Sequence, residues 1–419
     1  MNDSPSAKKP GQPSVELRSD VTPPNVPQPI ARLGNGSPFS GGGKKTIGII
    51  VGLLLLFIIV GLGAWAALRT GDGNDGDDDG TFFEELPFVD SVLPVTTSGL
   101  SGRECEDPDR RPIAAMLAGD PINRPMSGFS QADMVWELPV LVSNVTRLMA
   151  VYQCGHPTDI GSVRSARHDY LFLAAGIDAI LSHWGGSYHA LNRVTAGEFQ
   201  TLNALVNPSG AFFRKNHLPA PYNGFTTYEN LWTALQEAGY RTETEFKGYD
   251  FKDDAPVDER PAGGTLSVGW PGSFRVHYEY DPETNRYVRY WAGTRQVDAE
   301  NDEVVAPSAV VVIRATNEFA DGPGGYNDVG IQGTGTGTLF QDGGSTNITW
   351  SKSAVKFEDP MRFKDAETGR EVTFTRGQVW IMTPSEDIPV TWEVEEAEGT
   401  AATAPDTTTA PPPAGAVTY

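Results

Sequence analysis

One uncharged stretch constrains this chain more than any other feature. Residues 46–68 read TIGIIVGLLLLFIIVGLGAWAAL and contain no Asp, Glu, Lys or Arg. About 20 apolar residues are needed to cross the hydrocarbon core of a bilayer as a helix. A secretory signal peptide is the alternative, but its apolar core is shorter, at ~7–15 residues, and lies close to the N-terminus. Because residues 1–45 precede this run, we expect an uncleaved transmembrane anchor.

The flanking charges predict the orientation of that anchor. Lys44 and Lys45 precede the span, and a mainly acidic segment containing Asp75 and Asp77 follows it. Lysine and arginine next to a span are retained on the cytoplasmic side. We therefore expect a single-pass cell-membrane protein with a cytoplasmic N-terminus and extracytoplasmic C-terminal domains.

The charge balance limits the partners of the soluble part. The formal net charge is -22 and the sequence pI is about 4.6. A chain this acidic repels nucleic-acid phosphates, so we expect no nucleic-acid partner. The partners that we expect are the membrane and either a wall polymer or another envelope protein.

Two cysteines, Cys105 and Cys154, are the only ones in the chain. Outside the cytoplasm such a pair can form a disulfide, which would stabilise the fold by ~2–4 kcal/mol. The alternative is a pair of buried thiols. They do not form a C-x-x-C motif, so a redox or zinc role is not favoured. We favour the disulfide.

The composition along the chain predicts an α+β fold: an α/β N-terminal section and a mostly antiparallel β C-terminal section, preceded by the transmembrane helix. Helical and strand patterns alternate before about residue 263, and strands with turn signals dominate after it. The expected segments are a disordered cytoplasmic arm (1–45), the transmembrane helix (46–68), an acidic linker (69–104), an α/β domain (105–262), a β-rich domain (263–384) and a disordered tail rich in Thr, Pro and Ala (385–419).

Local patterns place the individual elements. In the first section we expect strands over 112–117, 145–153 and 179–183, helices over 165–176 and 229–238, and Ser130 as a possible helix N-cap before residues 131–137. In the second section we expect strands over 274–280, 287–291, 309–313, 338–340, 347–350, 371–374 and 379–382, with turns at 342–344 and 368–369.

Several stretches, taken in order, resemble the YerB-like family of bacterial envelope proteins, which carries domain of unknown function 3048. The stretches are RRPIAAML (110–117), RPMSGFSQADMVWE (124–137), TRLMAVYQ (146–153), GSVRSAR (161–167), HWGGS (183–187), FFRK (212–215), APYNGFT (220–226), YDPETNRYVR (280–289) and FKDAETGREVTFTRGQVWIM (363–382). The resemblance implies an extracytoplasmic module with an α/β section followed by a β section, and it implies no specific activity.

This chain departs from the family pattern in three respects. We expect a membrane helix at 46–68 in place of a lipid-bearing N-terminal cysteine. Tyr222 stands before Asn223 where relatives usually have His. The pair Cys105 and Cys154 is not a hallmark of the family.

A dense polar cluster suggests a site for an anion. Arginine grips carboxylates and phosphates through two parallel hydrogen bonds, and paired glycines can turn backbone N–H groups toward an anion. The candidate binding residues are Arg147, Arg164, Ser165, Arg167, Gly185, Gly186, Ser187 and Asn223. The structural alternative is that these arginines form buried salt bridges with Asp133, Glu137 and Asp169.

Catalytic candidates are fewer. Asp133 and Glu137 are four residues apart and would share a face of a helix; with His183 they could act as acid and base or hold a metal. Helical metal motifs usually present two histidines at this spacing, so we expect no metal there. No G-x-S-x-G motif accompanies His183 and Ser187. The run GTGTGT at 333–338 lacks the dinucleotide-binding spacing, and we expect no cofactor.

These observations predict a membrane-anchored extracytoplasmic envelope protein that binds an anionic wall component or a protein partner. The alternative function is a hydrolase that acts on a wall polymer through Asp133, Glu137 and His183. The sequence identifies no reaction.

Overall fold

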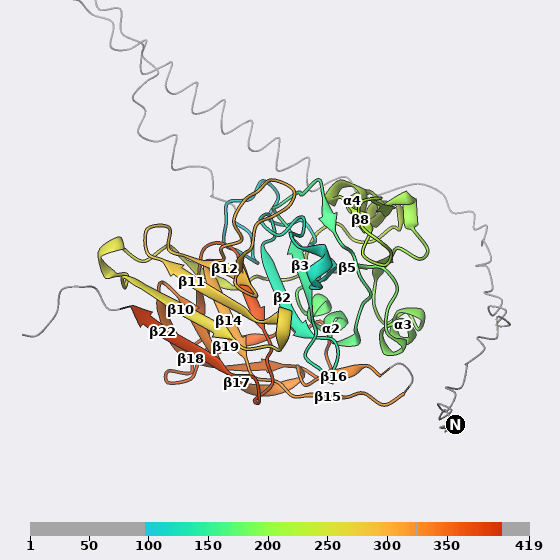
Figure 1. Ribbon diagram of the computed structural model, residues 1–419. Helices are drawn as coiled ribbons and strands as arrows, with labels where there is room; N and C mark the ends of the chain where they lie inside the picture. Colours follow the sequence, from blue (N-terminus) through green and yellow to red (C-terminus); the bar gives the residue numbers. More distant parts are fainter. Residues whose placement is uncertain (1–96, 323–324, 396–419) are drawn as a thin grey trace, which may run out of the picture. The chain divides into compact units, whose positions relative to one another are not determined.

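A ten-stranded mixed sheet organises the residues that the computed structural model describes, 97–322 and 325–395 (Figure 1). Its strands, in spatial order, are β19 (Arg362–Asp365), β18 (Gly344–Lys352), β17 (Gly333–Gln341), β14 (Ala309–Ile313), β21 (Val379–Met382), β2 (Met134–Pro139), β3 (Thr146–Tyr152), β1 (Ile113–Ala118), β5 (Ile180–His183) and β6 (Thr201–Asn203). Strands that precede residue 263 and strands that follow it therefore share one sheet. The boundary between two domains at residues 262 and 263 stays a prediction.

The central strands are buried on both faces. Every residue of β1, β2, β3, β14 and β21 is buried. Along β1, Ile113, Ala115 and Leu117 belong to one hydrophobic cluster, while Ala114 and Met116 belong to another. Both faces of the sheet are thus covered, as the continuous apolar runs in the sequence require.

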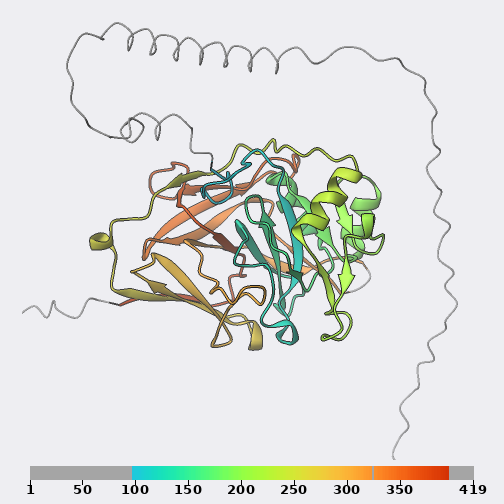
Figure 2. The same cartoon turned by 90° about the horizontal axis from the view of Figure 1, so that it is seen from above.

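An antiparallel five-stranded sheet covers one of these faces (Figures 1 and 2). Its spatial order is β13 (Thr294–Arg295), β12 (Arg286–Trp291), β11 (Val276–Asp281), β10 (Gly263–Val268) and β22 (Val390–Glu395). On β11, Val276, Tyr278 and Tyr280 are buried, whereas His277 is half-buried and Glu279 is exposed. This is the alternation expected of a half-buried strand.

Strand β22 corrects the prediction of a disordered tail from residue 385. Residues 390–395 pair with β10 in the register Leu266↔Trp392 and Gly264↔Val394. A Cβ on Gly264 would lie 2.5 Å from the Trp392 ring, so the glycine makes room for this indole. The alternation of apolar and polar residues over 390–395 is a strand signal, which the Thr/Pro/Ala-rich composition farther along masked.

Helices cover the remaining surfaces of the sheet. The helix α2 (His168–Gly176) packs its apolar residues into one cluster, and α4 (Tyr228–Glu237) places Leu231 and Leu235 in the other. The helix α3 (Tyr188–Thr195) follows β5 directly. The short elements are β4 (Ile160–Gly161), β7 (Phe213–Arg214), β8 (Gly224–Thr226), β9 (Asp250–Lys252), β15 (Asn317–Phe319), β16 (Asn327–Val329), β20 (Thr373–Thr375) and the 3-10 turns Pro121–Asn123, Pro208–Gly210, Val257–Glu259 and Gly272–Phe274.

The helix start suggested at Ser130 is wrong. Residues 134–139 form β2, because Met134, Trp136 and Leu138 face one cluster and Val135 faces the other, a period of two. The Ser130 hydroxyl donates to Asp298 Oδ2 at 2.9 Å instead of capping a helix. Glu137 therefore lies in a strand.

Within residues 97–322 and 325–395, no helix is both long and apolar enough to cross a bilayer. The expected span at 46–68 lies outside the described residues, as do residues 1–45, 69–96 and 396–419.

The predicted disulfide is confirmed. Cys105 and Cys154 are bonded, with their Cα atoms 5.3 Å apart. The bond joins the segment before β1 to the segment after β3, across a sequence separation of 49. The alternative of two buried thiols is therefore wrong.

A buried ion pair connects the two large sheets. Arg289 on β12 donates from Nη2 to Glu137 Oε2 on β2 at 2.7 Å, and both side chains are 0% exposed. The other carboxylate oxygen accepts from Thr146 Oγ1 at 2.9 Å. Oε2 also accepts from the Trp380 indole at 3.3 Å. Both oxygens of the buried carboxylate thus accept hydrogen bonds from protein donors.

Replacing Arg289 by Met should destabilise the protein strongly. The substitution leaves the Glu137 carboxylate buried without a cation, which costs about 3–5 kcal/mol of unfolding free energy. Urea denaturation of the purified protein measures this loss. In the double variant Arg289→Met/Glu137→Leu most of the stability should return, since no buried charge remains. A loss below about 1 kcal/mol in the single variant would contradict the role assigned to the pair.

Candidate anion-binding site

Two loops meet side by side where α2 and α3 begin. The loop at 164–167 leads into α2, and the loop at 184–187 leads into α3. The Ala166 N–H donates to the Gly185 carbonyl at 2.9 Å, and the Ser187 N–H donates to the Ala166 carbonyl at 3.0 Å. Two helix N-termini therefore start next to each other, and both carry partial positive charge.

Three arginines converge at these loops, and we call them the arginine cluster: Arg147, Arg164 and Arg167. Arg147 lies on β3, where Ala118 of β1 pairs with it, and its Nη1 donates to the Ser165 carbonyl at 2.8 Å. Burial, followed by the charges of Arg167 and Arg164, lowers the pKa of Arg147 to about 9. The electrostatic potential at the arginine cluster is thus positive, although the protein as a whole is acidic.

The structural alternative for these arginines, a set of buried salt bridges, is not observed. Within the described ranges, no carboxylate forms an ion pair with any member of the arginine cluster. Glu137 pairs with Arg289, and Asp169 contacts His168. Asp133 accepts hydrogen bonds from the backbone N–H groups of Gln153 and Cys154.

Aromatic rings cover two of the guanidinium groups. Arg164 lies 4.8 Å from the Tyr222 ring centroid, and Arg167 lies 4.6 Å from that of Tyr326. The Nε atoms of both arginines are buried and make no hydrogen bond. Tyr222 also donates its hydroxyl to Asp120 Oδ1 at 3.3 Å. Stacking holds these cations in place but leaves most of their N–H donors available.

Other residues predicted for the site have structural partners. The Gly185 N–H donates to Asn203 Oδ1 at 3.1 Å, so it does not point to an anion as expected. Asn223 Oδ1 accepts from Arg214 at 2.6 Å. The Ser165 hydroxyl donates to the Trp184 carbonyl at 3.1 Å.

Two predicted residues belong to the start of α3. The Ser187 hydroxyl caps this helix by accepting from the Ala190 N–H at 3.2 Å. Gly186 forms an isolated bridge with Ala166, and a Cβ there would lie 3.1 Å from Leu191. Both residues shape the loop beside the arginine cluster.

The structure does not bring Asp133, Glu137 and His183 together. All three side chains are fully buried, and the first two are engaged as described above. In the described part of the chain, the only group of three His, Cys, Asp or Glu ligand atoms within 4.8 Å of one another is a different one. His183 Nδ1 donates to the Gly185 carbonyl at 2.7 Å, and burial lowers its pKa to about 4. His183 is therefore neutral at pH 7.

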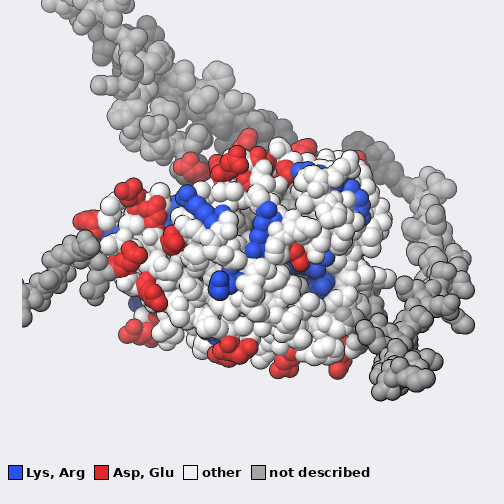
Figure 3. All heavy atoms as spheres, viewed as in Figure 1, with Lys and Arg blue, Asp and Glu red and all other residues white. Residues whose placement is uncertain are grey.

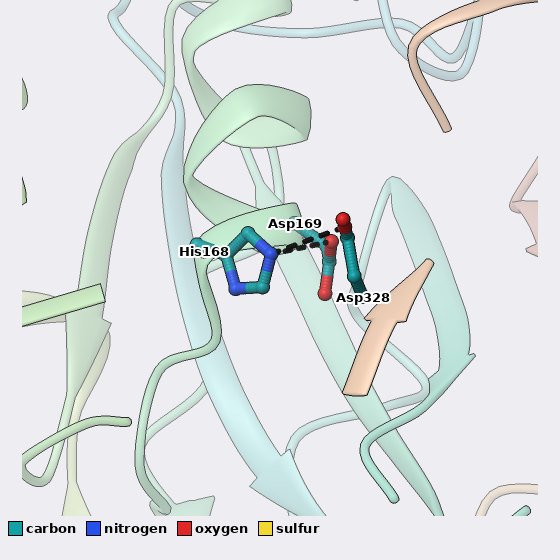
Figure 4. Close-up of side chains that lie close together, drawn as sticks. All are labelled: His168, Asp169 and Asp328. Atoms are coloured by element: carbon teal, nitrogen blue, oxygen red, sulfur yellow. Dashed lines mark hydrogen bonds and ion pairs between the residues drawn. The ribbon is translucent and has the colours of Figure 1, made fainter. Parts of the chain in front are cut away.

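The ligand atoms that do lie close together belong to His168, Asp169 and Asp328, which are shown in Figure 4. His168 Nε2 lies 3.3 Å from Asp169 Oδ1 and 3.2 Å from Asp328 Oδ1. Burial raises the pKa of Asp169 to about 7. Sequence reasoning missed the group because Asp328, on β16, lies 160 residues from His168.

The surface charges are unevenly distributed on the face shown in Figure 3. Lys and Arg gather in the middle of this face, while Asp and Glu lie mainly around its edge. The acidic net charge is therefore not spread evenly over the protein.

Replacing Arg147 by Met should leave the free energy of unfolding unchanged or raise it. The substitution removes a buried charge that repels Arg164 and Arg167, and Met retains the apolar stem. Urea denaturation of Arg147→Met and of Arg289→Met compares the change in unfolding free energy for an arginine without a carboxylate partner and for one with such a partner. A loss of about 3 kcal/mol for Arg147→Met would show that the arginine has a stabilising partner after all.

Replacing His183 by Asn should weaken the dependence of stability on pH. The pKa of His183 is lower in the folded protein than the ordinary value of about 6.5. The unfolded chain therefore binds the extra proton, and stability falls as the pH drops from about 6.5 to about 4. Urea denaturation at pH 7 and pH 4.5 should show a smaller loss for the variant than for the wild type. Equal losses would argue against a depressed pKa.

The comparisons with known proteins follow the same division of the chain. Two family profiles match, described as protein of unknown function (DUF3048) N-terminal domain over residues 97–241 and C-terminal domain over residues 266–381. The chain is 29% identical over 304 residues to "Putative lipoprotein YerB" of Bacillus subtilis (strain 168), covering 71% of this chain and 88% of that protein.

A solved structure agrees with these matches. The crystal structure of the YerB protein from Bacillus subtilis is similar with a TM-score of 0.62 at 26% identity, over 70% of this chain and 99% of that chain. The resemblance read from the ordered motifs is confirmed, and this chain belongs to the DUF3048 family.

Proposed function

We propose that this chain is a membrane-anchored envelope protein that binds an anionic group at the arginine cluster on its extracytoplasmic side. Three observations support the placement. The chain carries an uncharged stretch at 46–68 with lysines before it. It contains a formed disulfide, which persists in oxidising compartments. A relative is named as a lipoprotein.

One observation carries the binding proposal: among the described residues, no carboxylate forms an ion pair with any of the three clustered arginines. Arg147 and Arg167 are 8% and 5% exposed, and Arg164 lies beside them. An unpaired buried charge costs several kcal/mol, so a fold retains it only where the charge has a use. A bound carboxylate or phosphate supplies the missing negative charge and accepts the unused N–H donors.

The distribution of charge favours a compact anionic group over a long polyanion. The arginine cluster accounts for only a few positive charges, whereas the whole chain has a net charge of -22. A long polyanion would also lie along other parts of this acidic surface, which repel it. A single phosphate or carboxylate on a wall polymer meets only the arginines.

The hydrolase alternative gains no support from the geometry. Asp133, Glu137 and His183 are fully buried and each has a separate set of partners. An acid and a base that act on one bond must both reach the substrate. No observation favours this function over binding.

Pelleting with isolated bacterial wall tests the proposal. The full-length protein in detergent micelles is mixed with wall before and after chemical removal of its phosphodiester polymers. The double variant Arg164→Gln/Arg167→Gln should bind at least about tenfold more weakly, because hydrogen bonds to a charged group contribute about 1.5–3 kcal/mol each. The removal of the polymers distinguishes a phosphate ligand from a carboxylate ligand.

The matched control is Arg295→Gln/Arg370→Gln, which removes the same charge from two exposed arginines. It should bind as the wild type does. Equal binding by the cluster variant and the wild type would refute the proposal. Equal weakening of wall binding by both double variants would show that only the net charge matters. This result would refute the proposal as well.

A further inference from the structure

We propose that His168, Asp169 and Asp328 form a binding site for a divalent transition-metal cation of the Zn²⁺ or Mn²⁺ type. This site does not depend on the proposed anion binding, because different side chains form it. The three ligand atoms are His168 Nε2 and one carboxylate oxygen from each aspartate.

The spacing of these atoms fits a metal ion. His168 Nε2 lies 3.2 Å from Asp328 Oδ1 and 3.3 Å from Asp169 Oδ1. Metal–ligand bonds of about 2.0–2.2 Å place neighbouring ligand atoms roughly 3.0–3.5 Å apart in octahedral or tetrahedral geometry. The three side chains therefore need little rearrangement to surround one cation.

The charges and the exposure of the group also suit a cation. Two carboxylates and a neutral imidazole balance a charge of +2. The Asp169 side chain is only 2% exposed, whereas that of Asp328 is 64% exposed. A rigid buried ligand and an accessible one leave a side open to solvent, which is the arrangement of sites that keep a water or substrate position.

A second histidine lies beside the group, and one of its ring nitrogens has no hydrogen-bond partner. His189 on α3 has its ring centroid 5.3 Å from that of His168, and its Nε2 is buried without a hydrogen bond. A rotation of this side chain would bring a fourth ligand toward the cation. The mixture of imidazole and carboxylate donors favours Zn²⁺ or Mn²⁺ over Ca²⁺, which prefers oxygen ligands alone.

The elements of the fold hold the ligands in place. His168 and Asp169 are the first two residues of α2, and Asp328 is the central residue of β16. The Val329 N–H donates to Asp169 Oδ1 at 3.3 Å, which connects the helix to the strand. Figure 4 shows the imidazole facing both carboxylates.

Cation binding to the full-length, tag-free protein tests the site. The protein in detergent micelles is stripped with EDTA and titrated with Zn²⁺, Mn²⁺, Ca²⁺ or Mg²⁺ in a calorimeter. The wild type should bind one Zn²⁺ or Mn²⁺ per chain, and the cation should raise its melting temperature. Both cysteines are in the disulfide and do not compete for the metal.

Three variants identify the ligands. Asp328→Asn and His168→Gln should each weaken Zn²⁺ or Mn²⁺ binding at least about tenfold and remove the shift in melting temperature. Asp328 is exposed, so its variant tests the site even if His168→Gln folds poorly. Asp321→Asn removes the same charge from an exposed position near β16 and should bind as the wild type does.

Several outcomes would overturn the inference. These are the absence of saturable binding at one cation per chain, wild-type affinity in Asp328→Asn, and equal weakening by Asp321→Asn. The three side chains would then form only an ion-pair network between α2 and β16. Binding of Ca²⁺ or Mg²⁺ alone, unaffected by His168→Gln, would likewise exclude the histidine ligand.

Discussion

The buried pair of Arg289 and Glu137 constrains how the two sheets pack, because each charge is tolerated in the interior only beside the other. It joins β12 of the five-stranded sheet to β2 of the ten-stranded sheet. When the two sheets bury the faces that they share, the positive charge of one and the negative charge of the other are therefore buried together. A carboxylate at this depth would be costly alone, and the arginine offsets that cost only when both sequence sections are folded together. Strand β21 strengthens the same connection, because it lies in parallel pairing between β2 and β14. The two sections are therefore joined within one sheet in spite of the change in sequence character near residue 263.

The same residue type occurs in two opposite electrostatic situations. Arg289 is fully buried, faces a carboxylate and has hydrogen-bond partners for Nε and both Nη groups. Arg147 is nearly as buried, yet the charges that act on it most strongly are those of two further arginines, ahead of the opposing charge of Asp120. Burial alone thus does not distinguish a structural arginine from a functional one. The distinction lies in whether a carboxylate pairs with the arginine: Glu137 pairs with Arg289, whereas none of the described carboxylates pairs with the arginine cluster.

Local patterns in the sequence predicted most central elements, since strands such as 309–313 and helices such as 229–238 carry their signal in adjacent residues. Strand β22 was missed because its short alternation precedes a long tract of biased composition. The arginine cluster was found because two of its members are only three residues apart. The partners of Glu137 and His168 were not, because Arg289 and Asp328 are more than 150 residues distant from them in the chain. Pairings at such separations are set by sheet order and have no local signal.

Residues from the second section complete the region around α2. Tyr326 covers Arg167 and Asp328 faces His168, although both come from residues after the change in sequence character. The first section alone would leave the start of α2 with its arginines and helix dipole but without this aromatic cover and this carboxylate. A chain that lost the second section would therefore lose more than the five-stranded sheet. The two sections of this chain have to remain together because the polar region at α2 is assembled from both.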